Sequence, residues 1–464
     1  MILPELLTFL EAWRAVFAQD RTYRLAVHLA LATLYQLGRN TISQRITLLD
    51  AHRGDWNRFY RLFSQRRWTA DRLFDVLLQR AQPWCAGQYL VVAADDTLVR
   101  KSGKQIHNVG YLRDPLSPKF RHNLVLGLRY LQLSLLLPLY TTTAGAVSRA
   151  CALPIRFHLA AVVRKPKATK HQPLTAAHLA AFTQAKQANT LSKYLVDLVT
   201  DLRRWLDAHD LQRKILLLVV DNGYCTQTVF GVLSRTVQVL ARARGNYRLY
   251  AWDPHTRTAV ANDGFTPDAV RQAGDRPWQT TPVQFGAGPL SIKYKVVDQV
   301  VWPGGAGPRV LRLLVIAATP YKRRKYAKVQ YRQPGYLLTS DRKAPVAYLL
   351  QCYFDRWQIE VNHREEKMVI GVGDAQVSSQ TAVEREPGFA VAAYSLLKLA
   401  TLQAMGPTRT AEYAELPAWY AGARQPSCED ALQKLRKESW EHPEILAPYG
   451  VRITPEALIA ATRA

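Results

Sequence analysis

Several stretches of the chain repeat apolar residues every three to four positions, which predicts amphipathic helices. Residues 1–88 show this spacing throughout, and within them Thr41 and Thr69 stand where helix-capping residues are expected. The same spacing recurs further along in residues 190–209, 347–367 and 381–404. The pattern therefore predicts a helical N-terminal region and separate helices later in the chain.

Short, continuous apolar runs predict buried strands between these helices. The clearest runs are residues 89–94 and 214–220, and an aspartate follows each of them directly, Asp95 and Asp221. Other strand-like runs are residues 122–137, 156–163, 237–242, 291–301 and 309–318. Because carboxylates at the end of a central strand are a common place for chemistry, Asp95 and Asp221 become candidate site residues.

Residues 353–367 sort by face when they are wound as one α-helix at about 100° per residue. One narrow stripe of this helix carries Tyr353, Arg356, Glu360 and Lys367. A neighbouring apolar stripe, which would dock the helix on a sheet, carries Leu350, Phe354, Trp357, Val361 and Met368. Most helices of this composition are surface helices with salt bridges. One acid flanked by an aromatic and two cations instead indicates a metal ligand between groups that hold phosphate.

The charge balance adds a partner to this picture. The 464 residues contain 62 Lys and Arg against 36 Asp and Glu, a formal net charge of +26. This excess implies a polyanionic partner, with nucleic acid as the default, although charge alone leaves membrane-surface and heparin-type binding open. The 5 cysteines form no CxxC pair, which argues against a disulfide framework or a zinc site. With no signal-peptide or membrane-span pattern, we expect a soluble, cytoplasmic protein.

Three acids now stand out by context: Asp95 and Asp221 after strands, and Glu360 on a helix. If they converge, they can hold two divalent ions through oxygen ligands and support phosphoryl displacement. Carboxylates so close together would repel one another and take up protons without a cation, so Mg²⁺ or Mn²⁺ belongs to this hypothesis. An aspartate that ends a strand is more often a cap or turn residue, so the hypothesis depends on the combination with the charge.

Three basic segments are candidates for contacts with phosphate. Residues 100–104 form a cationic turn that includes Lys101 and Lys104. Residues 55–68 alternate aromatics with arginines, which suits either a DNA-facing surface or helix–helix packing with solvated arginines. Residues 321–328 form a basic turn, either a phosphate contact or a solvated loop.

Three motifs together resemble those of the DDE transposases of bacterial insertion sequences. They are Asp95-Asp96-Thr97, Asp221-Asn222-Gly223-Tyr224 and Tyr353-x2-Arg356-x3-Glu360-x6-Lys367, and the last is similar to the signature of the Tyr-Arg-Glu-Lys branch. The resemblance spans roughly residues 89–405. It implies an α/β ribonuclease H-like core, with a mixed sheet flanked by helices, interrupted by a β-rich insertion. The expected parts are a helical N-terminal DNA-end-binding domain (1–88), the core (89–244 and 336–405), the insertion (245–335) and a helical tail (406–464).

The resemblance also implies an activity and a set of site residues. The chain would be a cut-and-paste transposase that cleaves DNA at insertion-sequence ends and transfers the strands into target DNA. Asp95, Asp221 and Glu360 would be the catalytic ligands of two Mg²⁺ or Mn²⁺ ions. Asp95 is favoured over Asp96 because the family pattern places the acid two residues before Thr97. The DNA contacts would come from Tyr353, Arg356, Lys367, Lys101, Lys104 and a base-stacking tryptophan, either Trp278 or Trp302.

The implied partners are double-stranded DNA, as terminal inverted repeats and as target, and a second copy of the chain in a synaptic homodimer. The enzyme would work in the bacterial cytoplasm, on the nucleoid when bound to DNA. Two other functions stay open at this point. The chain could be a ribonuclease H-like nuclease or resolvase that cuts without joining strands. It could also be a domesticated DNA-binding protein that kept the fold and lost catalysis.

Overall fold

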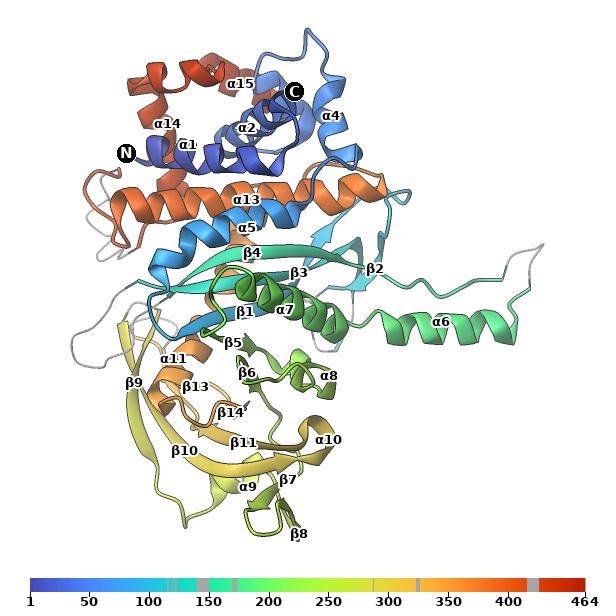
Figure 1. Ribbon diagram of the computed structural model, residues 1–464, viewed down its shortest axis with the longest axis vertical. Coiled ribbons are helices and arrows are strands. Elements are labelled where there is room, and N and C mark those ends of the chain that lie inside the picture. The colour runs from blue at the N-terminus through green and yellow to red at the C-terminus, as the bar shows by residue number, and fades with distance from the viewer. Residues whose placement is uncertain are drawn as a thin grey trace.

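The computed structural model describes all of the chain except residues 115, 116, 119, 122, 140–149, 169–172, 287, 323–325, 415–424 and 464. A long mixed sheet runs through the molecule, and the helices from both ends of the chain pack together over one end of it (Figure 1).

The N-terminal region is helical, as predicted. Its helices are α1 (Ile2–Ala12), α2 (Asp20–Tyr35), α3 (Ile42–Leu48), α4 (Asn57–Ser64) and α5 (Ala70–Ala81). Thr41 caps α3 through a capping box with Gln44, whereas Thr69 precedes α5 without a side-chain cap. Of the aromatic side chains in residues 55–68, those of Phe59, Phe63 and Trp68 are buried, and Phe63 packs against Phe389 at 5.4 Å between ring centroids. Trp56 and Tyr60 are exposed.

Helix α13 (Gln380–Met405) is the central element of this helical layer. Helices α1, α2, α4 and α5 all contact it. Among the described helices, α13 alone has the length and composition to cross a membrane, but 78% of its apolar window is buried inside the fold. The C-terminal helix α14 (Cys428–Glu441) packs on α1, and α15 (Pro455–Arg463) packs on α3. The N-terminal helices thus share one hydrophobic core with the rest of the chain, without a break at residue 88.

The core of the sheet has the order β4–β3–β1–β5–β6. Its strands are β1 (Tyr89–Arg100), β3 (Leu124–Pro138), β4 (Ala150–Ala160), β5 (Ile215–Val220) and β6 (Val237–Arg242). Strands β1, β5 and β6 are parallel, and β3 is antiparallel to β1. The short β2 (Gly110–Arg113) pairs with the start of β3. This mixed sheet flanked by helices agrees with the fold class that the sequence implied.

Helices cover both faces of this core. Helix α7 (Leu191–Asp207), capped by Thr190, and α8 (Gln227–Phe230), capped by Thr226, pack on one face. Helices α11 (Val346–Asp355) and α12 (Gln358–Met368) belong to the other. Helix α6 (Ala176–Ala188), which the sequence analysis did not predict, projects away from the body of the molecule (Figure 1).

Residues 245–335 are rich in strands, as predicted. The elements are β7 (Leu249–Asp253), β8 (Thr258–Phe265), α9 (Pro267–Gln272), β9 (Gln279–Phe285), β10 (Gly288–Trp302), α10 (Pro303–Ala306), β11 (Gly307–Ile316), β12 (Pro320–Tyr321) and β13 (Gln330–Tyr331). However, β7 to β11 continue the core sheet, and only β12 and β13 form a separate two-stranded sheet among the described residues. Strand β14 (Gly335–Thr339) pairs with β6 on one side and with β11 on the other, and so joins the two parts. The predicted basic turn at 321–328 includes residues 323–325, which lie outside the described residues.

Two strands differ in length from the sequence prediction: β1 ends later and β4 begins earlier than predicted. Strand β1 does not end at Ala94 but continues to Arg100, because β3 pairs with it along its whole second half. Asp95 therefore lies within the strand. The predicted strand at 156–163 is β4, which already begins at Ala150, and residues 140–149 before it lie outside the described residues.

The predicted helix over residues 353–367 is two helices with a bend at Arg356 and Trp357. The backbone N–H groups of Trp357, Ile359 and Glu360 bond to carbonyls three residues back instead of four, which interrupts the α-helical spacing. The predicted apolar stripe fails beyond this bend, since Trp357 is 50% and Met368 80% exposed. The buried face of α12 carries Ile359, Asn362, His363, Glu365 and Glu366 instead.

Candidate active site

The site is built where the parallel pairing of three neighbouring strands, β1, β5 and β6, ends. Ala94 of β1 is in register with Val220 of β5, and Val220 is in register with Ala241 of β6. The next residues along the three strands are Asp95, Asp221 and Arg242. Because paired strands lie about 4.8 Å apart, this register brings the two aspartates and the arginine together at one edge, where ligands of such sheets usually bind.

Strand geometry separates Asp95 from Asp96, because successive side chains of a strand point to opposite faces. Asp96 accepts a hydrogen bond from the Tyr224 hydroxyl at 2.9 Å, and its other oxygen lies 3.5 Å from Arg129 Nε. Asp95 lies on the other face, where its Oδ2 is 3.7 Å from Arg356 Nη1. Of these two residues, Asp95 is therefore the one that faces the helix of Glu360.

Arg356 joins the strand acids to the helix acid. It lies at the bend between α11 and α12 and is buried. Its Nη2 donates a hydrogen bond to Glu360 Oε1 at 3.1 Å, while its Nη1 faces Asp95. Asp221 also interacts electrostatically with this guanidinium. The three predicted acids thus meet around a single buried cation.

Tyr353 belongs to the same cluster. Its half-buried side chain interacts with Arg242, Arg356, Asp221 and Glu360, and burial raises the pKa of its hydroxyl. The structure therefore brings Tyr353, Arg356 and Glu360 to the strand-end aspartates, although the helix that carries them is bent.

Two acids of this cluster, Asp95 and Glu360, hold protons more tightly than exposed carboxylates do. Burial raises the pKa of Asp95 to about 7, with Arg356 opposing the shift and the charge of Asp96 adding to it. Burial also raises the pKa of Glu360, and again Arg356 opposes it. Such shifts are typical of functional sites, where carboxylates are crowded in a low-dielectric environment.

The donor chemistry of the cluster fits a divalent cation. The Asp221 Oδ1 atom is buried and accepts no hydrogen bond, and the Arg242 Nη1 atom lies 3.9 Å from it. Carboxylate oxygens are the ligands that Mg²⁺ and Mn²⁺ prefer. Within the described residues, no three acidic, His or Cys side chains lie close enough together to enclose an ion. Arg356, which lies between Asp95 and Glu360, supplies the positive charge in this arrangement.

The remaining predicted DNA contacts lie in different surroundings. Lys367 is exposed at the end of α12 and interacts electrostatically with Asp95 and Asp96, and Lys104 is exposed on its loop. Lys101 is buried, and its ammonium donates hydrogen bonds to the carbonyls of Gly373 and Ala375, both at 2.6 Å. Its ammonium donors are thus taken up inside the protein, so the fold does not favour a DNA contact at Lys101, which stays a prediction.

The two candidate tryptophans also differ in exposure. Trp302 is buried and stacks on Tyr247 with 4.4 Å between ring centroids, while Phe230 packs edge-on against it. This packing covers the ring, so the fold does not favour a base contact at Trp302, which stays a prediction. Trp278 is 38% exposed, and the Lys295 ammonium lies 4.7 Å from its ring centroid.

Arg242 is a site residue that the sequence analysis missed. A signal for it was present, since a cation directly ends the third parallel strand just as aspartates follow the first two. Reading the ends of all three strands together would have placed it beside Asp221.

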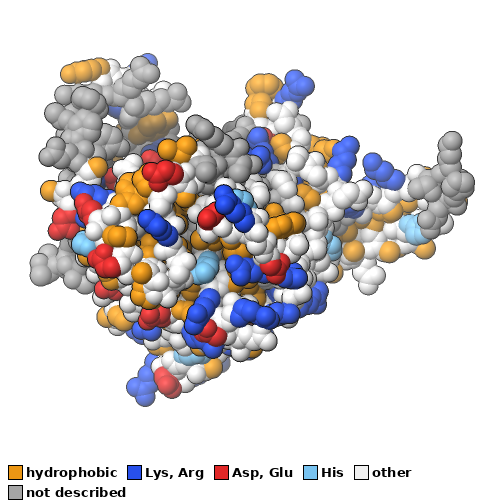
Figure 2. Space-filling model, turned by 90° about the horizontal axis from the view of Figure 1, so that it is seen from above, with side chains coloured by type: hydrophobic (Ala, Val, Ile, Leu, Met, Phe, Trp, Pro, Cys, Tyr) orange, Lys and Arg blue, Asp and Glu red, His pale blue; other side chains and the backbone are white. Residues whose placement is uncertain are grey.

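A second cationic feature lies in the N-terminal helices, between α2 and α4. A cavity of about 690 Å³ there is lined by five arginines (Arg21, Arg24, Arg58, Arg61 and Arg67), by Asp20 and Asp55, and by other residues of the two helices. We call it the arginine groove. Asp20 pairs with Arg24 and Asp55 with Arg61, each at 2.6 Å, so the groove keeps an excess of positive charge. Figure 2 looks onto this helical end of the molecule, where Lys and Arg side chains gather on part of the face.

Comparison with known proteins agrees with this geometry. A family model described as "DDE superfamily endonuclease" matches residues 15–288, a range that contains Asp95 and Asp221 and ends before Tyr353. No curated protein sequence matches the chain. The family match covers more than half of the chain, and the two aspartates within it lie side by side where the parallel pairing of β1 and β5 ends. The chain belongs to the DDE superfamily endonuclease family.

Proposed function

We propose that this chain is a DDE transposase of the Tyr-Arg-Glu-Lys branch, which cuts DNA at insertion-sequence ends and joins the ends to a target by a cut-and-paste route. The observation that carries the proposal is the meeting of Asp95, Asp221 and Glu360 around Arg356. Two ends must be joined, so the active form would be a homodimer on DNA, in the bacterial cytoplasm.

Asp95, Asp221 and Glu360 would hold two Mg²⁺ or Mn²⁺ ions. When bound, such ions activate water and neutralise the charge that develops on phosphate oxygens. The buried Asp221 oxygen without a hydrogen bond and the raised pKa of Asp95, to about 7, support this assignment. Both are costly for folding unless a cation completes the site.

The cations of the site would hold the DNA strand. Arg356 carries several N–H donors in a fixed plane, which suits a phosphate once the acids no longer need its charge. Arg242, Lys104 and Lys367 would contact phosphates further along the strand, because each is at least partly exposed near the edge that carries the acids or on the loop after β1. The Tyr353 hydroxyl would donate to the strand beside the cleaved bond.

The arginine groove would bind the duplex of the terminal repeat, away from the acids. Arginines give bidentate, salt-sensitive contacts to phosphates, and several of them in one groove could contact several phosphates of one duplex. The alternation of aromatics and arginines in residues 55–68 then has two roles. Phe63 and Trp68 pack on Phe389 of α13. Arg58, Arg61 and Arg67 line the groove.

One experiment tests the proposed function. The purified protein is incubated with Mg²⁺ and a DNA fragment that carries the terminal inverted repeats of the source element. We expect nicks at the repeat ends, followed by hairpin or strand-transfer products. The Glu360→Gln variant should bind the ends as the wild type does but leave them uncut.

The other outcomes identify the alternatives. Cleavage without any joined product would indicate a nuclease or resolvase, and binding without cleavage by the wild type would indicate a DNA-binding protein. Cleavage by Glu360→Gln at the wild-type rate would remove Glu360 from the site.

A further inference from the structure

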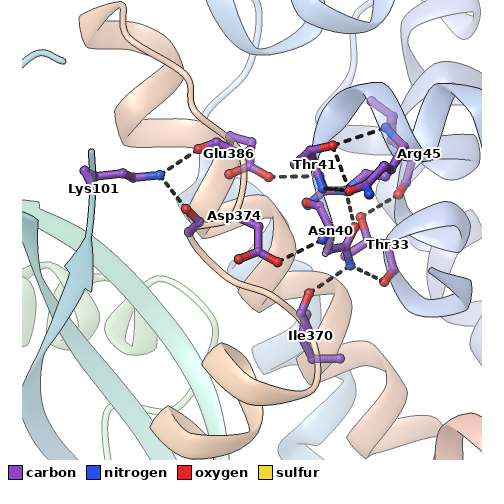
Figure 3. Close-up of polar contacts among 12 residues, drawn as sticks. Thr33, Asn40, Thr41, Arg45, Lys101, Ile370, Asp374 and Glu386 are labelled. Atoms are coloured by element: carbon purple, nitrogen blue, oxygen red, sulfur yellow. Dashed lines mark hydrogen bonds and ion pairs between the residues drawn. The ribbon is translucent and has the colours of Figure 1, made fainter. Parts of the chain in front are cut away.

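The loop that follows α12, residues 369–375, is held between β1 and the N-terminal helices (Figure 3). Lys101 comes directly after β1, and its backbone N–H still bonds to the Leu126 carbonyl of β3 at 2.9 Å. Its buried ammonium reaches across to the Gly373 and Ala375 carbonyls. Lys101 therefore connects the strand of Asp95 to the segment that ends the helix of Glu360.

The loop approaches β1 so closely that its backbone has no room for side chains at two positions. Gly371 and Gly373 have φ values of +70° and +102°, in the region that favours glycine. A Cβ atom on Gly373 would collide with the Val99 side chain of β1, and one on Gly371 would lie 2.7 Å from Asn40 Cβ. The loop is thus in direct contact with β1 on one side and with the α2–α3 connection on the other.

Asn40 holds the loop from that other side. Its backbone N–H donates to Asp374 Oδ2 and its Nδ2 donates to the Ile370 carbonyl, each at 2.8 Å. Arg45 Nε in turn donates to Asn40 Oδ1 at 2.6 Å, and its guanidinium pairs with Glu386 of α13 at 2.9 Å, with both side chains almost fully buried. These contacts leave the loop little freedom to move (Figure 3).

The loop follows α12 directly, with no linker between them. The N–H groups of Ile370 and Val372 bond to the carbonyls of Glu365 and Glu366, at 3.0 and 2.7 Å, so the helix passes directly into the clamped segment. A shift of the loop along β1 would therefore shift α12 by a similar amount. Glu360 on α12 and Asp95 on β1 would then change their separation.

We propose that Lys101 is a positioning residue for the metal site, which sets the distance between Glu360 and Asp95 by clamping the 369–375 loop to the end of β1. The inference rests on the proposed function in one respect, because it assumes that these two acids bind the same cations. Lys101 itself touches neither acid and acts only through the backbone of the loop.

A lysine whose ammonium is bound to carbonyls can also be merely structural, and the half-buried Lys214 offers the comparison. Its ammonium donates to the carbonyls of Cys85 at 2.8 Å and Ala86 at 3.1 Å, and also to that of Gly87, just before β1. The chemistry is the same as at Lys101, but the clamp lies at the amino ends of β1 and β5, the opposite end of the strands from the acids.

The test uses full-length Lys101→Met and Lys214→Met, compared with the wild type. Three quantities are measured: the thermal midpoint, Mn²⁺ affinity by calorimetry without DNA, and kcat on bound DNA ends. We expect Lys101→Met to lower both the affinity for Mn²⁺ and kcat about 10- to 100-fold. Mutation of residues that orient metal ligands typically has effects of this size. Lys214→Met should lower the thermal midpoint while Mn²⁺ affinity stays at the wild-type value. Lys101→Arg, which keeps the charge and donors, should recover part of the loss.

The outcomes separate this inference from the proposed function. Wild-type Mn²⁺ affinity in a folded Lys101→Met would overturn the positioning role and leave the transposase proposal intact. If the wild type itself binds no Mn²⁺, the metal site fails and the positioning role fails with it. Should Lys101→Met not fold, Asp374→Ala removes the loop's bond to Asn40 while Lys101 stays in place. Weakened Mn²⁺ binding in that variant supports the clamp, and unchanged binding contradicts it.

Discussion

At the scale of single residues, Arg356 is the most informative side chain of the site. It is buried between Asp95 and Glu360 and interacts with Asp221 as well. A guanidinium in that place stabilises three carboxylates that would otherwise repel one another. The same charge would oppose a divalent cation, so the proposed metal site requires the Arg356 guanidinium to move away from the acids when ions bind.

Arg356→Gln should therefore change metal and DNA binding in opposite directions. Removing the charge should tighten Mn²⁺ binding about tenfold, because the repulsion between the guanidinium and the ion disappears. Binding of DNA ends should weaken and become less dependent on salt, because one phosphate contact and its counterion release are lost. Calorimetry and a salt titration of end binding measure the two effects. An unchanged salt slope would indicate that Arg356 is only a structural ion-pair partner.

Glu366 gives a second residue-scale prediction, in the pH dependence of stability. Burial raises its pKa to about 8, with a Gln132 hydrogen bond and nearby lysines opposing the shift. In the unfolded chain it titrates near ~4.3. Between these pH values the folded protein keeps a proton that the unfolded chain has lost. The stability that this group contributes is therefore full below the lower value and is lost as the pH rises towards the upper one.

The difference in unfolding free energy between wild type and Glu366→Gln should fall with rising pH by up to ~1.4 kcal/mol per unit, and level off above a pH of about 8. Urea unfolding of both proteins across this range measures it. A flat difference for Glu366→Gln would mean that Glu366 is ionised in the folded protein.

At the scale of elements, α12 is held by polar contacts instead of an apolar seam. Asn362 Nδ2 donates to Ser134 of β3 at 3.2 Å, and Lys398 of α13 lies 3.6 Å from Glu365. The Tyr394 hydroxyl donates to Glu365 as well. Directional contacts of this kind select a single register, whereas apolar side chains can slide. The element that carries Glu360 is therefore placed by hydrogen bonds at its buried face and by the loop at its end.

The loop after α12 yields the prediction at this scale. Gly373→Ala should destabilise the protein by about 1–3 kcal/mol, because alanine is strained at its positive φ and its methyl group would collide with Val99. Gly54→Ala is the matched control, since no atom lies within 4 Å of a Cβ at that exposed glycine. It should change stability by less than about 0.5 kcal/mol. Chemical denaturation measures both, and equal effects would show that the loop can yield.

At the scale of the whole molecule, the described chain carries two cationic surfaces with different surroundings. The site at the sheet edge combines cations with three acids, whereas the arginine groove lies in the helical layer and has arginines in excess. The loop after α12 contacts that helical layer through Asn40. The part of the chain that would hold the duplex is thus connected by buried hydrogen bonds to the part that would cut it.

Replacing Arg58 and Arg67 by alanine should change DNA binding at the arginine groove without changing metal binding at the acid site. Affinity for DNA ends should fall and the salt slope should decrease by about one for each arginine, because each phosphate contact releases counterions. Mn²⁺ affinity should not change, since neither arginine lines the acid site. Arg80→Ala, another exposed arginine of the N-terminal region, serves as the control and should leave the slope unchanged. A loss of Mn²⁺ binding in the double variant would contradict this separation.

Local pattern in the sequence was enough to predict the parts that depend on nearest neighbours. Hydrophobic spacing located α7, α13, β5 and β6 to within a residue or two, because amphipathic helices and buried strands leave a periodic record. It also selected Asp95, Asp221 and Glu360, which the structure brings to one place. The roles of these residues as metal ligands, and the domain boundaries, stay predictions.

Only the tertiary structure decided the features that depend on distant partners. Strand β1 extends past Asp95 because β3 pairs with it, and the 245–335 strands join the core because β14 lies between β6 and β11. Lys101 looked like a surface cation, but the carbonyls that bury its ammonium come from a loop some 270 residues further along the chain. No local pattern records such a partner, because burial of a polar group is decided by whatever the fold places opposite it.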